Sequence, residues 1–272
     1  MSRRSAPDYE MVFRSLLDVV GPIPNLNRIM LDFEAATWVA IRNLIANGDF
    51  NEHLKIVGCH FHYTQCIVRK IKRIDGLISQ YNRNGSVNLF CRKIMALSLV
   101  PNSRIVEAFE YLQSLLNRMA VEDTVLQGKL QVLLNYVHNT WIDGPMFKHT
   151  DWCTYRLIVR TNNHLEGSHH RYNQRMGSSK PTFASLIEML HEESKTVKHI
   201  INQVYMGTSS TKQTKKAADR NIELEDIWSR YETGVIVDVT ELLEELTKGL
   251  EGPNENLVNF HADPDYIDHP QV

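Results

Sequence analysis

The chain of 272 residues carries 30 Lys or Arg and 32 Asp or Glu, which gives a formal net charge of −2. This balance excludes a global basic field that would draw the protein onto nucleic acid, so any such binding must come from a local patch. The four cysteines lack a disulfide-framework spacing, which favours a reducing, intracellular setting. No apolar run approaches the length of a membrane span.

The first part of the chain alternates between helical and strand-like patterns. Apolar spacing predicts a helix over residues 9–19, ended by Gly21 and Pro22. A β-compatible run over 28–31, a helix over 35–46, a second strand over 53–57 and a long helix over 60–81 follow. This strand–helix–strand–helix order favours parallel strands in an α/β layer.

The middle of the chain has a purely helical pattern, which we interpret as a helical insertion over 86–142. Helices are expected over 87–99, from the cap Ser103 onward, and over 123–142. A short apolar run at 155–159 leads into a polar stretch. Beyond it, a helix from Asn163 to Met176 and a longer one from the cap Thr182 to about Val204 are predicted.

Composition changes after residue 205. Residues 206–220 are rich in Thr, Ser and Lys and are interpreted as a linker. Short helices are expected within 221–249. The tail over 250–272 is acidic, has no Lys or Arg, and is interpreted as disordered or as an interaction segment.

Asp32 is the first candidate site residue, because it ends an apolar strand and Glu34 lies two positions further along the chain. A carboxylate at a strand end suits a hard cation such as Mg²⁺. The alternative is that Asp32 only caps the helix that follows.

Cys59 and His62 form a C-x-x-H pattern at the start of the helix over 60–81. Helical spacing puts Cys66 on the same face, so these three side chains are candidate ligands of a soft metal. A structural zinc needs a fourth ligand, and none is evident nearby. A buried thiol and a hydrogen-bonded imidazole are the alternative.

The polar stretch from Arg160 to Tyr172 is the third candidate region. Glu166 is followed by His169, His170 and Asn173, which share one helical face with it. A solvated helix face is the alternative interpretation. Two basic clusters are candidate phosphate contacts or solvated faces, namely Arg171 with Arg175, and Arg69, Lys70, Lys72 and Arg73.

Taken together, these segments resemble the catalytic core of Mutator-like element (MULE) transposases. Residues 32–36 read D-F-E-A-A and resemble the family's D-F-E-x-A motif, while residues 58–63 read G-C-H-F-H-Y and include its C-x-x-H signature, with Gln65 completing that block. T-W-I at 140–142 and R-T-N-N-H-L-E-G at 160–167 resemble its later motifs. The resemblance covers residues 9–205.

The resemblance implies an RNase H-like (DDE transposase) fold, α/β and mostly helical, with a helical insertion. It implies that Asp32 is the second catalytic acid and Glu166 the third, and that both bind Mg²⁺ or Mn²⁺. Cys59 and His62 would orient the site near DNA. The DNA contacts are expected at the polar motif and the helix after it: Arg160, Asn163, His170, Arg171 and Arg175. A nuclear location follows from this ancestry.

The first aspartate of the family's three acids has no counterpart before Asp32, because Asp8, Glu10 and Asp18 lie on no apolar strand. We therefore expect a core truncated at its N-terminus: a domesticated, transposase-derived DNA-binding protein without strand-transfer activity of its own. Two alternatives stay open. One is a helical protein-interaction module, with self-association or another protein partner. The other is a nuclease completed by a second chain.

Overall fold

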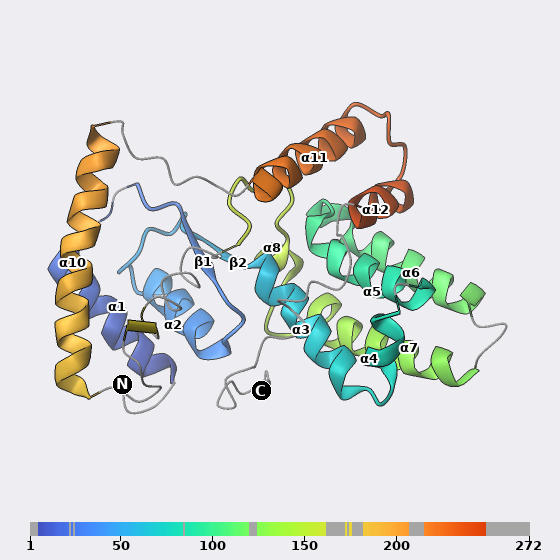
Figure 1. Cartoon of the computed structure of the whole chain (residues 1–272), viewed down its shortest axis with the longest axis horizontal. Coiled ribbons are helices and arrows are strands. Elements are labelled where there is room, and N and C mark those ends of the chain that lie inside the picture. The colour runs from blue at the N-terminus through green and yellow to red at the C-terminus, as the bar shows by residue number, and fades with distance from the viewer. Residues whose placement is uncertain are drawn as a thin grey trace. The chain divides into compact units, whose positions relative to one another are not determined.

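The computed structural model describes residues 5–21, 23, 25–83, 85–119, 124–161, 172, 174–175, 182–206 and 215–248. The chain divides into two compact units. One comprises residues 1–161 together with 223–272, and the other comprises residues 162–222. Figure 1 shows a mostly helical chain. Within the described residues, the strands form one two-stranded sheet.

The sheet pairs β1 (Arg28–Leu31) with β2 (Lys55–Gly58) in parallel, with Leu31 opposite Gly58. The crossover between them is α2 (Ala35–Ala46), which packs against α1 (Ala6–Val20). This confirms the predicted order of elements and the parallel pairing. The second strand begins two residues later than predicted, because Asn51 turns the chain and accepts backbone N–H bonds from His53 and Leu54.

The predicted helix over 60–81 is wrong as a single element. It consists of α3 (His60–Arg73) and α4 (Leu77–Tyr81). The break lies at Ile74–Gly76, where Gly76 adopts a φ of +68° and the N–H of Leu77 donates to the carbonyl of Ile74. Glycine reaches this left-handed conformation without the penalty that a Cβ imposes. The apolar stripe runs on across the break, so periodicity alone did not reveal it.

The helical insertion contains α5 (Ser86–Ala96), the 3₁₀ turns η1 (Leu97–Leu99) and η2 (Asn102–Arg104), α6 (Ile105–Met119) and α7 (Thr124–Val137). Ser103 lies inside η2 and is not the cap of α6, which is a correction to the prediction. The predicted helix over 123–142 ends in a π-helical turn, η3 (His138–Ile142), and α8 (His149–Trp152) follows.

The core beneath the sheet is built from aromatic rings. Trp38, Tyr63, Trp141 and Trp152 are fully or almost fully buried. Tyr63 stacks on Trp152 with ring centroids 5.1 Å apart and meets Trp141 edge-on at 5.0 Å. Such pairs stabilise a core by about 0.5–1.5 kcal/mol beyond the area that they bury. This cluster ties the sheet, α3 and the end of the insertion together.

The C-terminal helices are α11 (Lys215–Glu232) and α12 (Val239–Lys248). From Glu223 onward they belong to the same compact unit as the sheet. Lys93 of α5 pairs with Glu244 of α12 at 2.7 Å, and Arg92 donates to the carbonyl of Thr247. The expected linker over 206–220 is helical from Lys215, and the tail over 250–272 lies outside the described residues.

The second unit contains α10 (Phe183–Tyr205). Its predicted cap is confirmed, because the hydroxyl of Thr182 accepts the backbone N–H of Ser185 at 3.2 Å. Most of the helix predicted over 163–176 lies outside the described residues. In the part of the chain that the structure describes, no helix has both the length and the apolar character needed to cross a membrane.

Candidate functional site

The two strands end side by side, and this places two of the predicted motifs together. Asp32 follows the last residue of β1, and Cys59 follows the last residue of β2. The backbone N–H of Cys59 donates to the carbonyl of Leu31 at 2.8 Å. The carboxyl ends of parallel strands thus bring the D-F-E and C-x-x-H motifs to one edge of the sheet, which we call the strand-end site.

Asp32 does not cap the helix that follows it. The N-cap of α2 is Glu34, whose side chain makes no capping bond. The carbonyl of Asp32 instead accepts the indole N–H of Trp38 at 2.6 Å. The carboxylate of Glu34 accepts the hydroxyl of Tyr9 through both oxygens, at 2.8 and 2.9 Å. Glu34 therefore ties α1 to α2, while Asp32 occupies the end of the strand.

Phe33 anchors the turn between these two acids. Its ring fills the space next to Gly58, where an added Cβ would lie 2.2 Å from the ring. The ring also meets Trp141 edge-on, with centroids 4.7 Å apart. The position of Asp32 therefore depends on the absence of a side chain at residue 58.

The C-x-x-H motif lies at the start of α3, and its cysteine and histidine are buried. Cys59 is the N-cap residue and is fully buried, and His62 is 9% exposed. In the ranges that the structure describes, no group of three or more His, Cys, Asp or Glu side chains is arranged to hold a metal ion. Cys59, His62 and Cys66 do not form such a group, so the soft-metal hypothesis finds no support in these residues.

Arg160, the first residue of the R-T-N-N-H-L-E-G motif, also contacts the start of α3. The backbone N–H of His60 donates to the carbonyl of Arg160 at 2.9 Å. His60 is itself held by its Nδ1, which lies 2.7 Å from the hydroxyl of Ser98. The strand-end site thus includes Asp32, Cys59 and the backbone of Arg160. Glu166, Asn163, His170 and Arg171 lie outside the described residues.

The side chain of Arg160 is buried, so we do not retain it as a DNA contact. Its guanidinium lies 5.4 Å from the ring centre of Trp228 and donates to the carbonyl of Leu157 at 2.9 Å. Desolvation by burial lowers the pKa of this guanidinium, while the nearby Glu225 acts in the opposite direction. A phosphate would have to displace the Trp228 contact to reach it. The residue fixes the chain at this point.

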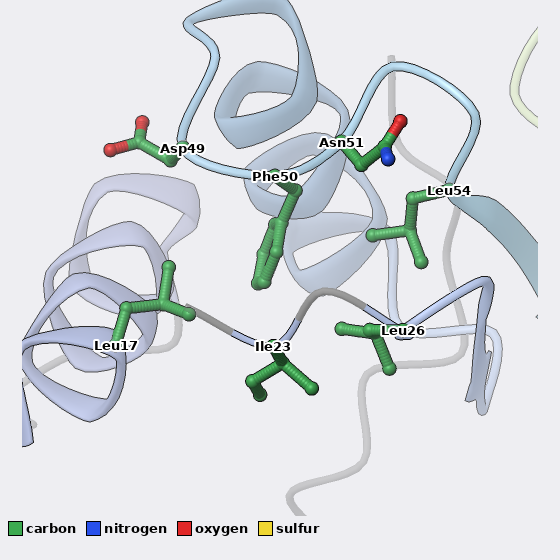
Figure 2. A pocket seen from close by; sticks show the side chains of 7 residues that line it. All are labelled: Leu17, Ile23, Leu26, Asp49, Phe50, Asn51 and Leu54. Carbon is green, nitrogen blue, oxygen red and sulfur yellow. The ribbon is translucent and has the colours of Figure 1, made fainter. Parts of the chain in front are cut away.

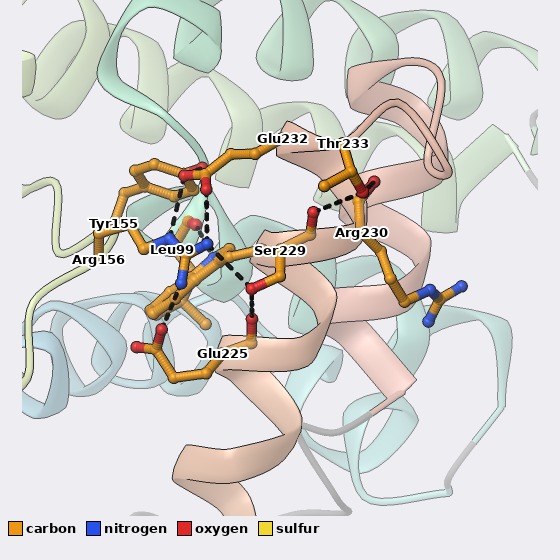
Figure 3. A network of polar contacts seen from close by, with 9 residues as sticks. Leu99, Tyr155, Arg156, Glu225, Ser229, Arg230, Glu232 and Thr233 are labelled. Carbon is orange, nitrogen blue, oxygen red and sulfur yellow. Dashed lines mark hydrogen bonds and ion pairs between the residues drawn. The ribbon is translucent and has the colours of Figure 1, made fainter.

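Sequence reasoning missed the network that holds the apolar run before Arg160 (Figure 3). Arg156 forms ion pairs with Glu225 and Glu232 of α11 and donates to the hydroxyl of Ser229 at 3.1 Å. The hydroxyl of Tyr155 donates to Glu232 at 2.7 Å. The available signal was the spacing of Glu225 and Glu232, which lie seven residues apart on one helical face.

This network explains why the apolar run at 155–159 forms no strand in the structure. Arg156 has a φ of +57°, an uncommon conformation for a residue with a side chain. Its side chain turns to α11, while Ile158 and Val159 are exposed. A residue held in a sparsely populated conformation persists only where its surroundings over-determine it, as the two carboxylates do here.

Arg175 is the one predicted DNA contact whose side chain lies partly open in the described structure. It pairs with Glu193 of α10 at 3.0 Å, and its side chain is 51% exposed whereas that of Glu193 is 9% exposed. Both residues belong to the second unit. The pairing leaves part of the guanidinium accessible.

A small cavity of about 180 Å³ lies where the end of α1 meets the loop after α2 (Figure 2). Leu17, Phe50 and Leu54 supply much of its apolar wall. The carboxylate of Asp49 points away from Phe50 in Figure 2 and pairs with Arg14 at 2.8 Å. The cavity therefore offers apolar contact and no charged group directed at a ligand.

Comparison with known proteins identified no relative of this chain. No family model, curated protein or solved structure matches the chain significantly.

Proposed function

We propose that the chain is a DNA-binding protein derived from a Mutator-like element transposase and that it retains part of an RNase H-like core. One observation supports this above the others. The strand-end site brings together the starts of three separate sequence motifs, through the bond from Cys59 to Leu31 and the bond from His60 to Arg160. In open α/β sheets, ligands bind outside the carboxyl ends of the strands.

The proposal does not include strand cleavage by this chain alone. A two-metal phosphoryl-transfer site needs several carboxylates close together. The resemblance supplies Asp32 and Glu166, and Glu34 is engaged by Tyr9. The described residues at the strand-end site therefore do not provide a ligand set that fits Mg²⁺ or Mn²⁺, and we derive no step through either ion.

Equilibrium binding to a DNA duplex of about 30 base pairs tests the proposal. Because phosphate contacts release counterions, affinity should fall as salt rises, with a slope of roughly −0.9 for each contact. The variant Arg171→Gln with Arg175→Gln should weaken binding, whereas Lys148→Gln, an exposed charge elsewhere, should not. Absence of duplex binding at about 25 mM salt would sink the proposal.

The nuclease alternative makes a different prediction. It requires strand cleavage that depends on Mg²⁺ or Mn²⁺ and is abolished by Glu166→Gln and by Asp32→Asn. We expect no cleavage by the wild-type chain with either ion. If the wild-type chain cleaves DNA and both substitutions abolish the cleavage, the chain is a complete nuclease and our proposal that it does not cleave DNA by itself is wrong.

A protein-interaction module is the second candidate, and the surface of α10 favours it. Phe183, Ile187, Leu190 and Val197 recur at helical spacing and are exposed by 78, 49, 46 and 44%. An apolar stripe of this kind suits another helix. Light scattering over a range of concentrations tests self-association, and Ile187→Glu with Leu190→Glu should reduce any dimer. If the chain is monomeric at all concentrations, self-association through α10 is excluded.

A further inference from the structure

The cavity between the end of α1 and the loop after α2 is apolar on most of its sides. Its volume is about 180 Å³, and Leu17, Ile23 and Leu26 line it from the segment that ends α1 and leads to β1. Phe50 and Leu54 line it from the loop, and Figure 2 shows the ring of Phe50 pointing toward Ile23. An apolar cavity of about 150 Å³ can hold a benzene molecule. The cavity therefore has room for one small ring.

The walls of the cavity are held in place by contacts within the protein. The ring of Phe50 meets that of Phe13 edge-on, with centroids 6.4 Å apart, and the backbone N–H of Phe50 donates to the carbonyl of Leu44 at 3.3 Å. Arg14 pairs with Asp49 at 2.8 Å. These contacts fix the loop to both α1 and α2, so the cavity is preformed. A void lined by apolar groups lowers stability in a close-packed fold, and a molecule that fills it restores the missing contacts.

A second hollow, of about 260 Å³, shares Leu26 and Asn51 with the cavity. Its other lining residues are Asn25, Asn27 and His53, which are all exposed. A carboxamide is uncharged and offers both an N–H donor and a carbonyl acceptor. The apolar cavity therefore adjoins a hollow lined by three carboxamides, which we call the amide hollow.

The hydrogen-bonding groups of the amide hollow are only partly used. The Oδ1 of Asn51 accepts the backbone N–H of His53 at 2.8 Å, which leaves its side-chain N–H groups for another partner. In the described part of the chain, the side chains of Asn25 and Asn27 make no hydrogen bond. The imidazole of His53 lies 3.7 Å from Glu52, and both side chains are 85% exposed, so water solvates this pair. The polar groups offered to a ligand are therefore mainly neutral amides.

The cavity and the amide hollow lie at the end of the sheet where both strands begin. Asn27 directly precedes β1 and Leu54 directly precedes β2, and the N–H of Lys55 donates to the carbonyl of Asn27 at 3.1 Å. The strand-end site lies at the opposite end of the same four-residue strands, about 13 Å away. The two sites are therefore separate.

We propose that the cavity and the amide hollow form one binding site for a small uncharged molecule. Its apolar body fills the cavity, and its head group, which both donates and accepts hydrogen bonds, reaches the asparagine amides. An apolar wall beside a few polar groups is typical of small-molecule sites. A charged head group would lose hydration without gaining a counter-charge. This site goes beyond DNA binding and does not depend on it.

Benzamide is the probe, because its ring matches the cavity and its carboxamide matches the amide hollow. In an NMR titration of the full chain, benzamide should shift the resonances of the lining residues with a Kd of about 1 mM. Benzoate has the same shape and a negative charge, and it should bind about tenfold more weakly or worse. The proposal is overturned if benzamide gives no saturable shift up to about 20 mM, or if benzoate binds equally well.

Two variants test the cavity and the amide hollow separately. Leu17→Phe fills the cavity and should abolish the binding of benzamide and of toluene, which has no head group. The matched control Leu16→Phe makes the same change at an exposed neighbour on α1 and should leave the Kd within about twofold. Asn25→Leu with Asn27→Leu removes two exposed amides and should weaken benzamide about tenfold while leaving toluene within about twofold.

Thermal unfolding of each variant shows whether the fold is retained. If Leu17→Phe does not fold, the exposed asparagine pair still tests the site. The proposal is wrong if folded Leu17→Phe binds benzamide as Leu16→Phe does, or if the asparagine variant binds it as the wild type does. None of these results depends on binding to a duplex, so this proposal and the proposed function fail independently.

Discussion

The substitution Gly58→Ala tests whether the strand-end site depends on close packing. The added methyl group would lie 2.2 and 2.5 Å from two ring carbons of Phe33 and 3.1 Å from the backbone oxygen of Asp151. No positive φ is involved, so the conflict is between the methyl group and its neighbours rather than within the backbone. The ring of Phe33 has to move, and Asp32 precedes it directly.

The expected cost follows from the surroundings of that ring. Phe33 lies between Trp141 and Phe147, with ring centroids 4.7 and 5.2 Å away, so it has little room to shift. Overpacking a core of this kind costs about 1–3 kcal/mol. Phe33→Leu makes room for the methyl group, so the two substitutions should couple favourably by about 1 kcal/mol or more.

Urea unfolding of the wild type, both single variants and the double variant measures these free energies. Gly128→Ala is the control, because a Cβ there meets nothing within 4 Å. It should raise the free energy of unfolding by about 0.5–1 kcal/mol, as expected for glycine inside a helix. A Gly58→Ala variant as stable as the wild type, or additive effects in the double variant, would refute the packing argument.

Three further predictions concern the rest of the first unit. Trp228→Ala removes the ring beneath Arg156 and Arg160 and should cost about 3–5 kcal/mol in urea unfolding; a loss below about 1 kcal/mol contradicts that role. Bonds from Arg156 first, and then from Tyr155, lower the pKa of Glu232 in the folded state. Its contribution to stability is therefore present above the ordinary carboxyl pKa of about 4.3 and lost as pH falls. Glu232→Gln should reduce the acid sensitivity of the urea midpoint, and an unchanged pH profile would count against the network. Burial raises the pKa of Cys91 to about 12, so a thiol reagent at about pH 8 should label it only after unfolding, whereas rapid native labelling lost in Cys91→Ala would contradict its burial.

Local pattern was sufficient to predict the elements up to residue 58 in the first part of the chain. The helix over 35–46 has the predicted bounds, and the two short strands pair in parallel as their alternation with helices indicated. Helical periodicity and a strand–helix–strand order are properties of neighbouring residues, so they can be read from the sequence. The break at Gly76 was not predicted, because the apolar stripe satisfies the helical period on both sides of it.

The candidate site was predictable only in part. The motifs named Asp32, Cys59 and His62, and the parallel strands explain why Asp32 and Cys59 follow the paired strand ends at one edge of the sheet. The role of Arg160 was not predictable, because its partner Trp228 lies 68 positions further along the chain and no local period links them. The role of Glu166 as a catalytic acid stays a prediction from sequence resemblance, because this residue lies outside the described residues.

The sequence by itself determined most of the helices and both short strands to within a few residues and identified the residues with reactive or charged side chains, because both depend on the order of side chains along a short stretch. The tertiary structure decided which of those residues meet. It assigned Glu34 to Tyr9, Arg160 to Trp228 and Arg156 to the glutamates of α11. These pairings depend on packing between segments that are distant in the sequence, so no local pattern could indicate them.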